Sequence, residues 1–260
     1  MIEQIRAKSR GQWAVVTGAS SGIGEACARQ LAQAGYSLVL AARRKERLSA
    51  LAVELGKSTN AEIVITELDV TDREAVSAWA RANQATLKKV RVLVNSAGLA
   101  AGLDTFDTAS LDDWEQMIQT NVMGLLYVTK AVLPFMLENN DGHIVNIGSV
   151  AGRHTYPKGN AYCASKAAVK SLNESLRVDL CGKAIRVTEI SPGMVETEFS
   201  LVRLKDADKA KAVYKGIQAL SAGDVADAVS WSIGRPAHVN IQEMVIYPTM
   251  QASPTVVHRS

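Results

Sequence analysis

Short apolar runs alternate along this chain with longer segments that have helical spacing. The apolar runs are rich in Val, Ile and Leu and cover residues 13–17, 37–42, 62–68, 90–95, 143–147, 185–190 and 244–247. The helical segments cover residues 22–34, 45–55, 73–85, 111–139, 161–181 and 225–233. Nearly continuous apolar strands are typical of a parallel sheet that is buried on both faces. The pattern predicts an α/β fold, a Rossmann-type doubly wound parallel sheet of about seven strands flanked by helices.

The chain shows no Pro-, Gly- or Ser-rich linker and no internal repeat, so residues 1–260 are expected to form a single domain. A hydrophobic fraction of 47% suffices for a large core, and a net charge of +3 is too small to favour nucleic acid or a membrane surface. Three cysteines without metal-ligand spacing predict a reduced, cytoplasmic protein with no metal site. A charged N-terminus, and no uninterrupted apolar run long enough to span a bilayer, predict neither a signal peptide nor a membrane helix.

The first predicted strand runs into a glycine-rich turn, and a helix follows at once. Backbone N–H groups and the helix dipole at such a turn favour a pyrophosphate. The spacing is GxxxGxG rather than the GxGxxG of the dinucleotide fingerprint, and a purely structural turn is the alternative. Cofactor binding is the preferred interpretation because the turn joins the first strand to the first helix. The residues of this predicted site are Gly18, Ser20, Ser21, Gly22, Ile23 and Gly24.

Ala42, Arg43 and Arg44 end the second predicted strand, where a dinucleotide site meets the adenosine ribose. An acidic residue there would bind the 2′-hydroxyl of NAD, whereas two guanidinium groups favour the 2′-phosphate of NADP. The pair therefore predicts NADP(H) as the cofactor. The alternative, that one or both arginines are solvated residues at a helix start, is stronger for Arg44 than for Arg43.

The ends of other strands supply further candidates for cofactor contacts. Asp69 either contacts the adenine amino group or caps the helix that begins near Asp72. A Pro-Gly turn after the sixth strand can bring backbone amides to the nicotinamide amide. These predicted cofactor contacts are Asp69, Val70, Asn95, Ala97, Gly98, Pro192, Gly193, Val195 and Thr197.

Tyr162 and Lys166 lie four residues apart in a predicted helix and so project from one face. An ammonium one turn away is expected to lower the pKa of the phenol toward the range useful for general acid–base catalysis. Ser149, just after the fifth strand, can hold a reacting oxygen. Asn121 is a poor residue for a helix interior, which indicates either a buried polar role or a helix distortion beside Gly124. A lone YxxxK pair is also consistent with an ordinary amphipathic helix.

Taken together, the motifs resemble the short-chain dehydrogenase/reductase family over essentially the whole chain. In chain order they are TGxxxGxG at 17–24, NxAG at 95–98, Asn121, Ser149, YxxxK at 162–166 and Pro192-Gly193. Ser96 departs from the family, which more often has a second asparagine at this position. Any one motif is weak, whereas the ordered set is specific.

The resemblance implies a role for each matching residue. Tyr162 would be the general acid in reduction and the base in oxidation, with Lys166 lowering its pKa and holding the nicotinamide ribose. Ser149 would polarise the substrate oxygen, and Asn121 would anchor a water of the proton relay. Hydride would pass between the nicotinamide and the carbinol carbon, with no need for a metal.

Residues 41–44, 146–152 and 237–244 resemble one branch of this family, which contains NADP-dependent serine and 3-hydroxy acid dehydrogenases, malonic semialdehyde reductases and sulfoacetaldehyde reductases. The branch implies an oxidoreductase that interconverts a small anionic aldehyde or ketone and its alcohol. A cation should then lie near Tyr162 and Ser149. Arg153 is the candidate, and a surface loop role is its alternative. The other predicted substrate contacts are Gln242, Met244 and Tyr247.

Two further regions are expected to complete the site. Residues 196–222 lose periodicity and gain lysines, which indicates a lid over the substrate. In this family the C-terminal segment, here 241–260, often packs at a subunit interface, which implies a homo-oligomer and favours a tetramer. Two other functions stay open: a reductase for a bulkier neutral ketone, and a non-catalytic NADP-binding regulatory protein.

Overall fold

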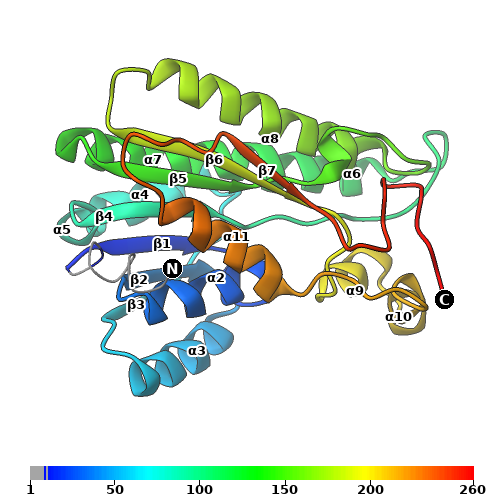
Figure 1. Cartoon of the computed structure of the whole chain (residues 1–260), viewed down its shortest axis with the longest axis horizontal. Coiled ribbons are helices and arrows are strands. Elements are labelled where there is room, and N and C mark those ends of the chain that lie inside the picture. Colours follow the sequence, from blue (N-terminus) through cyan, green and yellow to red (C-terminus); the bar gives the residue numbers. More distant parts are fainter. Residues whose placement is uncertain (1–8, 10) are drawn as a thin grey trace.

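One parallel sheet organises the chain, with the strand order β3-β2-β1-β4-β5-β6-β7 (Figure 1). This computed structural model describes residue 9 and residues 11–260. The charged N-terminal residues 1–8, which predict the absence of a signal peptide, lie outside the described residues. The strands are β1 Trp13–Thr17, β2 Ser37–Ala42, β3 Ile63–Glu67, β4 Val90–Asn95, β5 Gly142–Ile147, β6 Ile185–Pro192 and β7 Glu243–Ile246.

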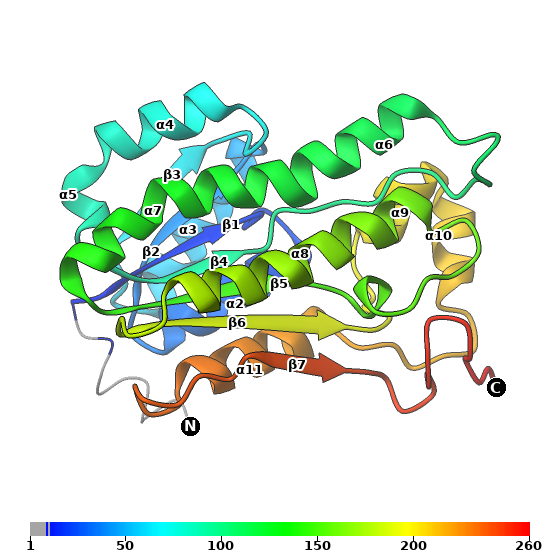
Figure 2. The ribbon, with the colours of Figure 1, turned by 90° about the horizontal axis from the view of Figure 1, so that it is seen from above.

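Helices cover both faces of the sheet (Figures 1 and 2). One layer contains α2 Gly22–Gln33, α3 Lys45–Ser58 and α11 Ala222–Ile233. The other contains α4 Arg73–Ala82, the short α5 Gln84–Leu87, α7 Leu125–Asn139 and α8 Asn160–Asp179. Alternate strand residues serve the two layers: Val16 and Leu40 pack with the first core, and Val15 and Val39 with the second. The strands therefore read as continuous apolar runs because both of their faces are buried.

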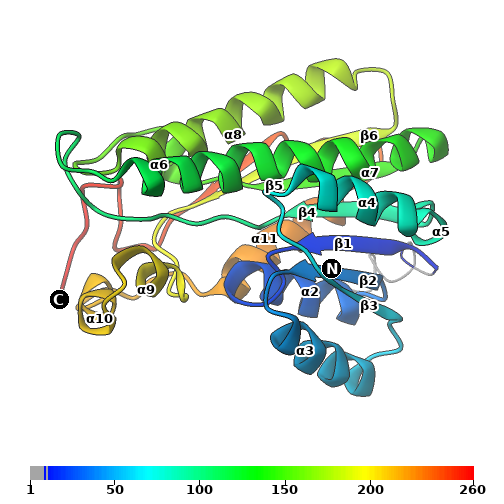
Figure 3. The same ribbon diagram turned by 180° about the vertical axis from the view of Figure 1, so that it is seen from behind.

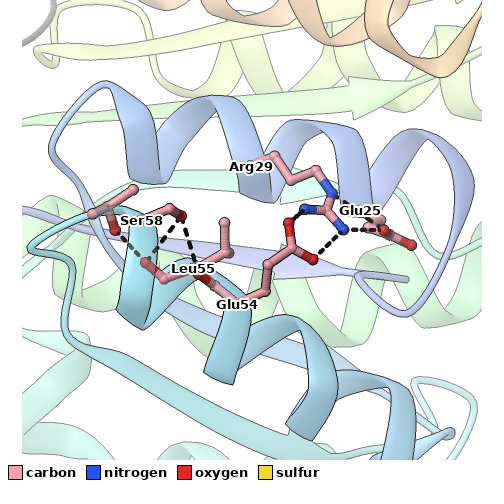
Figure 4. Close-up of polar contacts among 6 residues, drawn as sticks. Glu25, Arg29, Glu54, Leu55 and Ser58 are labelled. Atoms are coloured by element: carbon pink, nitrogen blue, oxygen red, sulfur yellow. Dashed lines mark hydrogen bonds and ion pairs between the residues drawn. The ribbon is translucent and has the colours of Figure 1, made fainter.

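An arginine joins α2 and α3 at their outer surface (Figure 4). The Arg29 guanidinium donates to Glu25 one turn earlier on α2, at 2.7 Å, and also pairs with the Glu54 carboxylate of α3. The hydrogen bond from Arg29 lowers the pKa of Glu54. This pair therefore links the C-terminal half of α3 to α2.

The predicted helix over residues 111–139 is continuous but not uniform. It consists of α6 Leu111–Ile118, a π-helical segment, η1 Gln119–Gly124, and α7. By length and composition this helix could cross a membrane. In the structure it instead lies along the sheet (Figure 3), where Val128, Val132 and Met136 pack in the core. Its apolar character is therefore explained by the core that it covers.

Residues 196–222, which lack a periodic pattern in the sequence, contain two short helices, α9 Phe199–Leu204 and α10 Ala207–Val213. The C-terminal end of the chain lies against this region (Figure 1). The Ser260 N–H donates to the Gly216 carbonyl at 3.0 Å, and the Arg259 guanidinium donates to the carbonyls of Val213 and Lys215. The two regions expected to complete the site thus contact each other within one chain.

Candidate active site

A cavity of about 660 Å³ lies at the carboxyl ends of the strands. The strand order reverses between β1 and β4, and open α/β sheets bind ligands beyond the strand ends at such a point. Most of the predicted cofactor contacts line this cavity together with Ser149, Tyr162 and Lys166. They are Gly18, Ser20, Ser21, Gly22, Ile23, Gly24, Arg43, Arg44, Asp69, Val70, Ala97, Gly98, Pro192, Gly193, Val195 and Thr197.

Gly18 brings the turn after β1 against the end of β4. Its φ is +65°, in the left-handed region, and a Cβ there would stand 2.9 Å from the Cα of Ala97. The Thr17 hydroxyl fixes the approach by accepting from the N–H groups of Ser96, at 3.0 Å, and Ala97, at 3.1 Å. Ser21, the N-cap of α2, makes no side-chain cap. The first N–H groups of α2 therefore face the cavity without a side-chain acceptor, as a pyrophosphate site requires.

Arg44 reaches back from β2 to the glycine-rich turn. Its guanidinium donates to the hydroxyls of Ser20, at 3.2 Å, and Ser21, at 2.5 Å. It also donates to Glu198 at 2.9 Å, while its side chain is 43% exposed at the N-cap of α3. Arg43 is 64% exposed, with Nη1 4.0 Å from the Asp69 carboxylate. Two guanidinium groups beside an anion-binding turn fit a dinucleotide that carries an additional phosphate.

Two predicted cofactor contacts are resolved differently by the structure. Asp69 lines the cavity and accepts from the N–H and hydroxyl of Thr71, whereas the cap of α4 is Asp72; the capping alternative for Asp69 is wrong. Asn95 does not line the cavity, contrary to the prediction. Its amide donates to the Thr129 hydroxyl and to Asn146, both at 2.9 Å, because its side chain points into the layer between β4, β5 and α7.

Ser149, Tyr162 and Lys166 line one part of the cavity. The Lys166 Nζ donates to the carbonyl of Ile147 at 2.9 Å and lies 6.0 Å from the centroid of the Tyr162 ring. The Ser149 hydroxyl accepts from the N–H of Ala151 and so caps the short η2 helix Val150–Gly152. Lys166 and Ser149 are thereby attached to the same stretch of backbone at the end of β5.

Burial raises the pKa of Tyr162, while its hydrogen bond with Ser149 and the charge of Arg203 oppose the shift. The expected lowering by Lys166 is not found in this structure, because desolvation of the phenolate outweighs the nearby charges. Burial also lowers the pKa of Lys166 to about 8, with the charge of Glu189 opposing. Tyr162 is therefore a neutral phenol at neutral pH, which is the form that donates a proton.

Asn121 has both of the features anticipated for it. It lies in the π-helical segment η1, and its side chain is buried. Its Oδ1 accepts from the Leu99 N–H at 2.8 Å, and its Nδ2 donates to the Leu99 carbonyl at 2.8 Å and to the Ser165 hydroxyl at 3.0 Å. A Cβ at Gly98 would stand 3.2 Å from Asn121 Oδ1 and 3.6 Å from Lys166 Nζ. Glycine there keeps open the space between the amide and the ammonium.

The predicted substrate cation lies elsewhere. The Arg153 guanidinium pairs with Glu243 and lies 3.9 Å from Glu189, and it does not line the cavity. The reason is that two carboxylates on β6 and β7 draw it under the sheet end rather than toward Tyr162. The other predicted substrate contacts also lie outside the cavity lining: Gln242, Met244 and Tyr247.

Arg203 of α9, which no sequence pattern indicated, is a cation beside Tyr162. Its guanidinium carbon lies 5.6 Å from the centroid of the Tyr162 ring and lines the same cavity. Nη1 donates to the Tyr156 hydroxyl at 2.8 Å, and Nε donates to the Gly102 carbonyl at 3.0 Å. Arg259 of the C-terminal tail lines the cavity as well. Both arginines come from segments without periodicity, so only the fold brings them to the site.

Comparison with known proteins places this arrangement in a family. Residues 12–208 match the family model for short chain dehydrogenases. The chain belongs to the short-chain dehydrogenase family. The expected resemblance is thereby confirmed, and the parallel seven-stranded sheet is the fold that its structural neighbours share.

Several relatives of this short-chain dehydrogenase are similar over nearly their whole length. An NADP-dependent 3-hydroxy acid dehydrogenase, YdfG, of Salmonella typhi is 46% identical over 95% of this chain and 99% of its own. Sulfoacetaldehyde reductase 2 of Chromohalobacter salexigens is 44% identical over 92% of this chain and 94% of its own. A serine dehydrogenase solved in its closed form with NADP+ has a TM-score of 0.88 and 44% identity, over 96% of this chain and 100% of its own.

Proposed function

We propose that this enzyme interconverts a small anionic aldehyde or ketone and its alcohol, of the 3-hydroxy acid or sulfoacetaldehyde type. The chain is an NADP-dependent oxidoreductase of the short-chain dehydrogenase family. The substrate class rests on one observation: the guanidinium of Arg203 lies over the ring of Tyr162 within one cavity. The relatives named for 3-hydroxy acids and sulfoacetaldehyde support it, because those compounds carry an anion a few bonds from the reacting carbon.

The residues that line the cavity suit NADP(H). The open N-terminus of α2 and the turn at Gly18 suit its pyrophosphate, and Arg43 and Arg44 suit its 2′-phosphate. When bound, the cofactor supplies or accepts the hydride. Pro192, Gly193, Val195 and Thr197 line the cavity and are proposed to contact the nicotinamide end.

The chain's own residues move and hold the proton. In reduction Tyr162 donates its phenolic proton to the substrate oxygen, and in oxidation the phenolate takes the proton back. The Ser149 hydroxyl donates a hydrogen bond to the same oxygen. The ammonium of Lys166 stabilises the phenolate that forms on Tyr162. Gly98 leaves the space between the Asn121 amide and Lys166 open, and the amide gives this space a polar wall. The space therefore suits a water that returns a proton to Tyr162.

The guanidinium groups are proposed to select NADPH. Arg43→Ala and Arg44→Ala are each expected to lower the ratio of kcat/KM with NADPH to that with NADH by roughly 10- to 150-fold, which corresponds to the loss of a charge-assisted hydrogen bond worth about 1.5–3 kcal/mol. The NADH values should hardly change. Steady-state kinetics with both cofactors at one aldehyde concentration measure the ratio.

Arg47 provides the matched control for this measurement. It pairs with Glu198 at 2.7 Å, as Arg44 does at 2.9 Å, yet it does not line the cavity. Arg47→Ala should therefore leave the ratio at the wild-type value. A wild-type preference for NADH, or an equal loss in Arg47→Ala, would contradict the assignment of the phosphate to Arg43 and Arg44.

Substrate charge is tested with the wild-type enzyme and a panel of aldehydes. Sulfoacetaldehyde, malonic semialdehyde and succinic semialdehyde are compared with propanal and butanal in NADPH oxidation, and serine and 3-hydroxypropionate in NADP+ reduction. We expect at least about 10-fold higher kcat/KM for the anionic aldehydes, because a charge-assisted bond to Arg203 is worth at least about 1.5 kcal/mol. Equal turnover of neutral aldehydes would contradict the anionic substrate class.

The same panel separates the competing functions. A reductase for bulky neutral ketones would prefer an aromatic or polycyclic ketone over every small aldehyde. A regulatory NADP-binding protein would bind the cofactor and turn over none of them. A lid at 196–222, a single domain, a cytoplasmic location and a tetramer stay predictions; size-exclusion chromatography with light scattering measures the last.

A further inference from the structure

Two carboxylates face each other on the last two strands, behind the catalytic turn. Glu189 of β6 and Glu243 of β7 are register partners, and Glu189 is only 1% exposed. Like charges on neighbouring strands destabilise a sheet unless a cation lies between them. The Arg153 guanidinium is that cation: it pairs with Glu243 and lies 3.9 Å from Glu189 Oε1.

Glu189 lies directly under the backbone that holds two catalytic side chains. A Cβ at Gly148 would stand 2.1 Å from Glu189 Oε1, so no side chain separates this carboxylate from the end of β5. On one side of Gly148, the Ile147 carbonyl accepts from Lys166; on the other side is Ser149. Glu189 also accepts a hydrogen bond from the Ser191 hydroxyl.

The four charges balance in a space that is buried at Glu189 and Lys166 and partly exposed at Glu243. Lys166 and Arg153 carry two positive charges, and Glu189 and Glu243 carry two negative charges. Burial lowers the pKa of Lys166 to about 8, and the negative charge of Glu189 opposes this effect. The other polar groups close to Lys166, Tyr162 and Asn121, are uncharged at neutral pH. Without Glu189, the buried ammonium would lose its compensating charge.

We propose that Glu189 is a positioning residue that keeps Lys166 protonated, and that Arg153 joins Glu189 and Glu243 to the Ser149 turn. Arg153 then supports the catalytic residues through Glu189 and the Ser149 turn and does not bind the substrate. The inference rests on the proposed function, because the ammonium form of Lys166 matters only where Tyr162 exchanges a proton. It adds a residue outside the Tyr–Lys–Ser set to the acid–base machinery.

The direct test is a titration of Lys166 in the cofactor-free protein. Lysine labelled with ¹³C at Cε is followed by NMR from pH 6 to 11, with Lys166→Met identifying the signal. The expected midpoint is about 8 in the wild type and lower by about one unit in Glu189→Gln, the small end of the effect of a nearby opposite charge. Glu243→Gln is the matched control, because it removes a carboxylate of the same cluster but leaves Glu189 in place. Its midpoint should equal that of the wild type.

The same shift should appear in the pH dependence of kcat, measured with NADPH and the best aldehyde of the panel. The quantity compared is the pH at which kcat falls on the alkaline side. The active form of Lys166 is the ammonium, so activity falls as pH rises through its pKa. In Glu189→Gln this pH should thus lie about one unit lower, whereas Glu189→Asp, which keeps the charge, should restore it. Titration midpoints that coincide in all three proteins would overturn the proposal. The titration needs no turnover, so its result is independent of whether the proposed substrate class is correct.

If Glu189→Gln does not fold, Glu189→Asp and Arg153→Lys keep the proposal testable. Both keep every charge of the cluster and change only its geometry, so the Lys166 midpoint should stay within a few tenths of a unit. A midpoint that falls by about one unit in Glu189→Asp, which keeps the negative charge at position 189, would assign the effect to packing and overturn the role of the Glu189 charge.

Discussion

Replacing Tyr162 by phenylalanine is expected to lower kcat for aldehyde reduction by on the order of 10²–10⁴-fold, the usual effect of losing a positioned acid–base group. The phenol is buried and its pKa is raised, so Tyr162 holds its proton until the substrate oxygen gains negative charge. Phenylalanine keeps the packing against the Phe199 ring, whose centroid lies 5.5 Å away, and removes only the hydroxyl. Stopped-flow measurement of NADPH oxidation at saturating aldehyde gives the effect on the chemical step.

Tyr156→Phe is the matched control. Tyr156 lines the same cavity, but its hydroxyl accepts from Arg203 rather than facing Ser149. The same change there should cost far less in kcat, and NADPH fluorescence titrations should show unchanged cofactor binding in both variants. Turnover of Tyr162→Phe within a few-fold of the wild type would exclude Tyr162 as the proton donor.

Replacing Arg203 by methionine is expected to lower kcat/KM for the preferred anionic aldehyde by roughly 10- to 150-fold, from the loss of a charge-assisted hydrogen bond worth about 1.5–3 kcal/mol. Most of the loss should appear in KM if the anion is bound equally in the ground state and the transition state. Methionine retains much of the length of the side chain that packs over the rings of Tyr156 and Tyr162. Steady-state kinetics over a wide range of aldehyde concentrations separate KM from kcat.

A neutral aldehyde of the same length controls for damage to the site. Arg203 also donates to the Gly102 carbonyl, so its loss can loosen α9 as well as remove a charge. Propanal reduction should then be nearly the same in wild type and Arg203→Met, and Arg203→Lys should lie between them for the anionic substrate. Lys205→Met, which removes an exposed cation just after α9, should have no effect. Equal losses for neutral and anionic aldehydes would contradict the anion-binding role.

Local patterns in the sequence predict most of the scaffold correctly. The runs at 13–17, 37–42 and 90–95 coincide with β1, β2 and β4, because strands buried on both faces are apolar at most positions. The glycine spacing predicts a turn that the Gly18 conformation requires. Tyr162 and Lys166 share a helix face through their spacing alone. In each case the information lies within a few residues of the chain.

Local sequence patterns do not predict the contacts between distant segments of the chain. Asn95 occupies a motif position of the family, yet its amide is used between β4, β5 and α7. The side chain of Asn121 in the π-helical segment hydrogen-bonds the Leu99 backbone and Ser165, which are distant in the sequence. The lowering of the Tyr162 pKa by Lys166 followed from spacing, but burial, which spacing does not record, has the opposite and larger effect.

Local sequence patterns therefore identify the residues proposed for cofactor binding and proton transfer, but they do not identify the residues beside the substrate. The glycine-rich turn, the arginine pair, Ser149 and the YxxxK pair each follow from spacing within one element and its adjoining loop. Which arginine lies beside Tyr162 was decided by packing. Arg153, four residues after Ser149, is drawn to Glu189 and Glu243, whereas Arg203 comes to Tyr162 on a short helix some forty residues further along the chain. Carboxylates on two strands hold the Arg153 guanidinium, and loop residues hold that of Arg203; both sets of contacts exist only once the chain has folded.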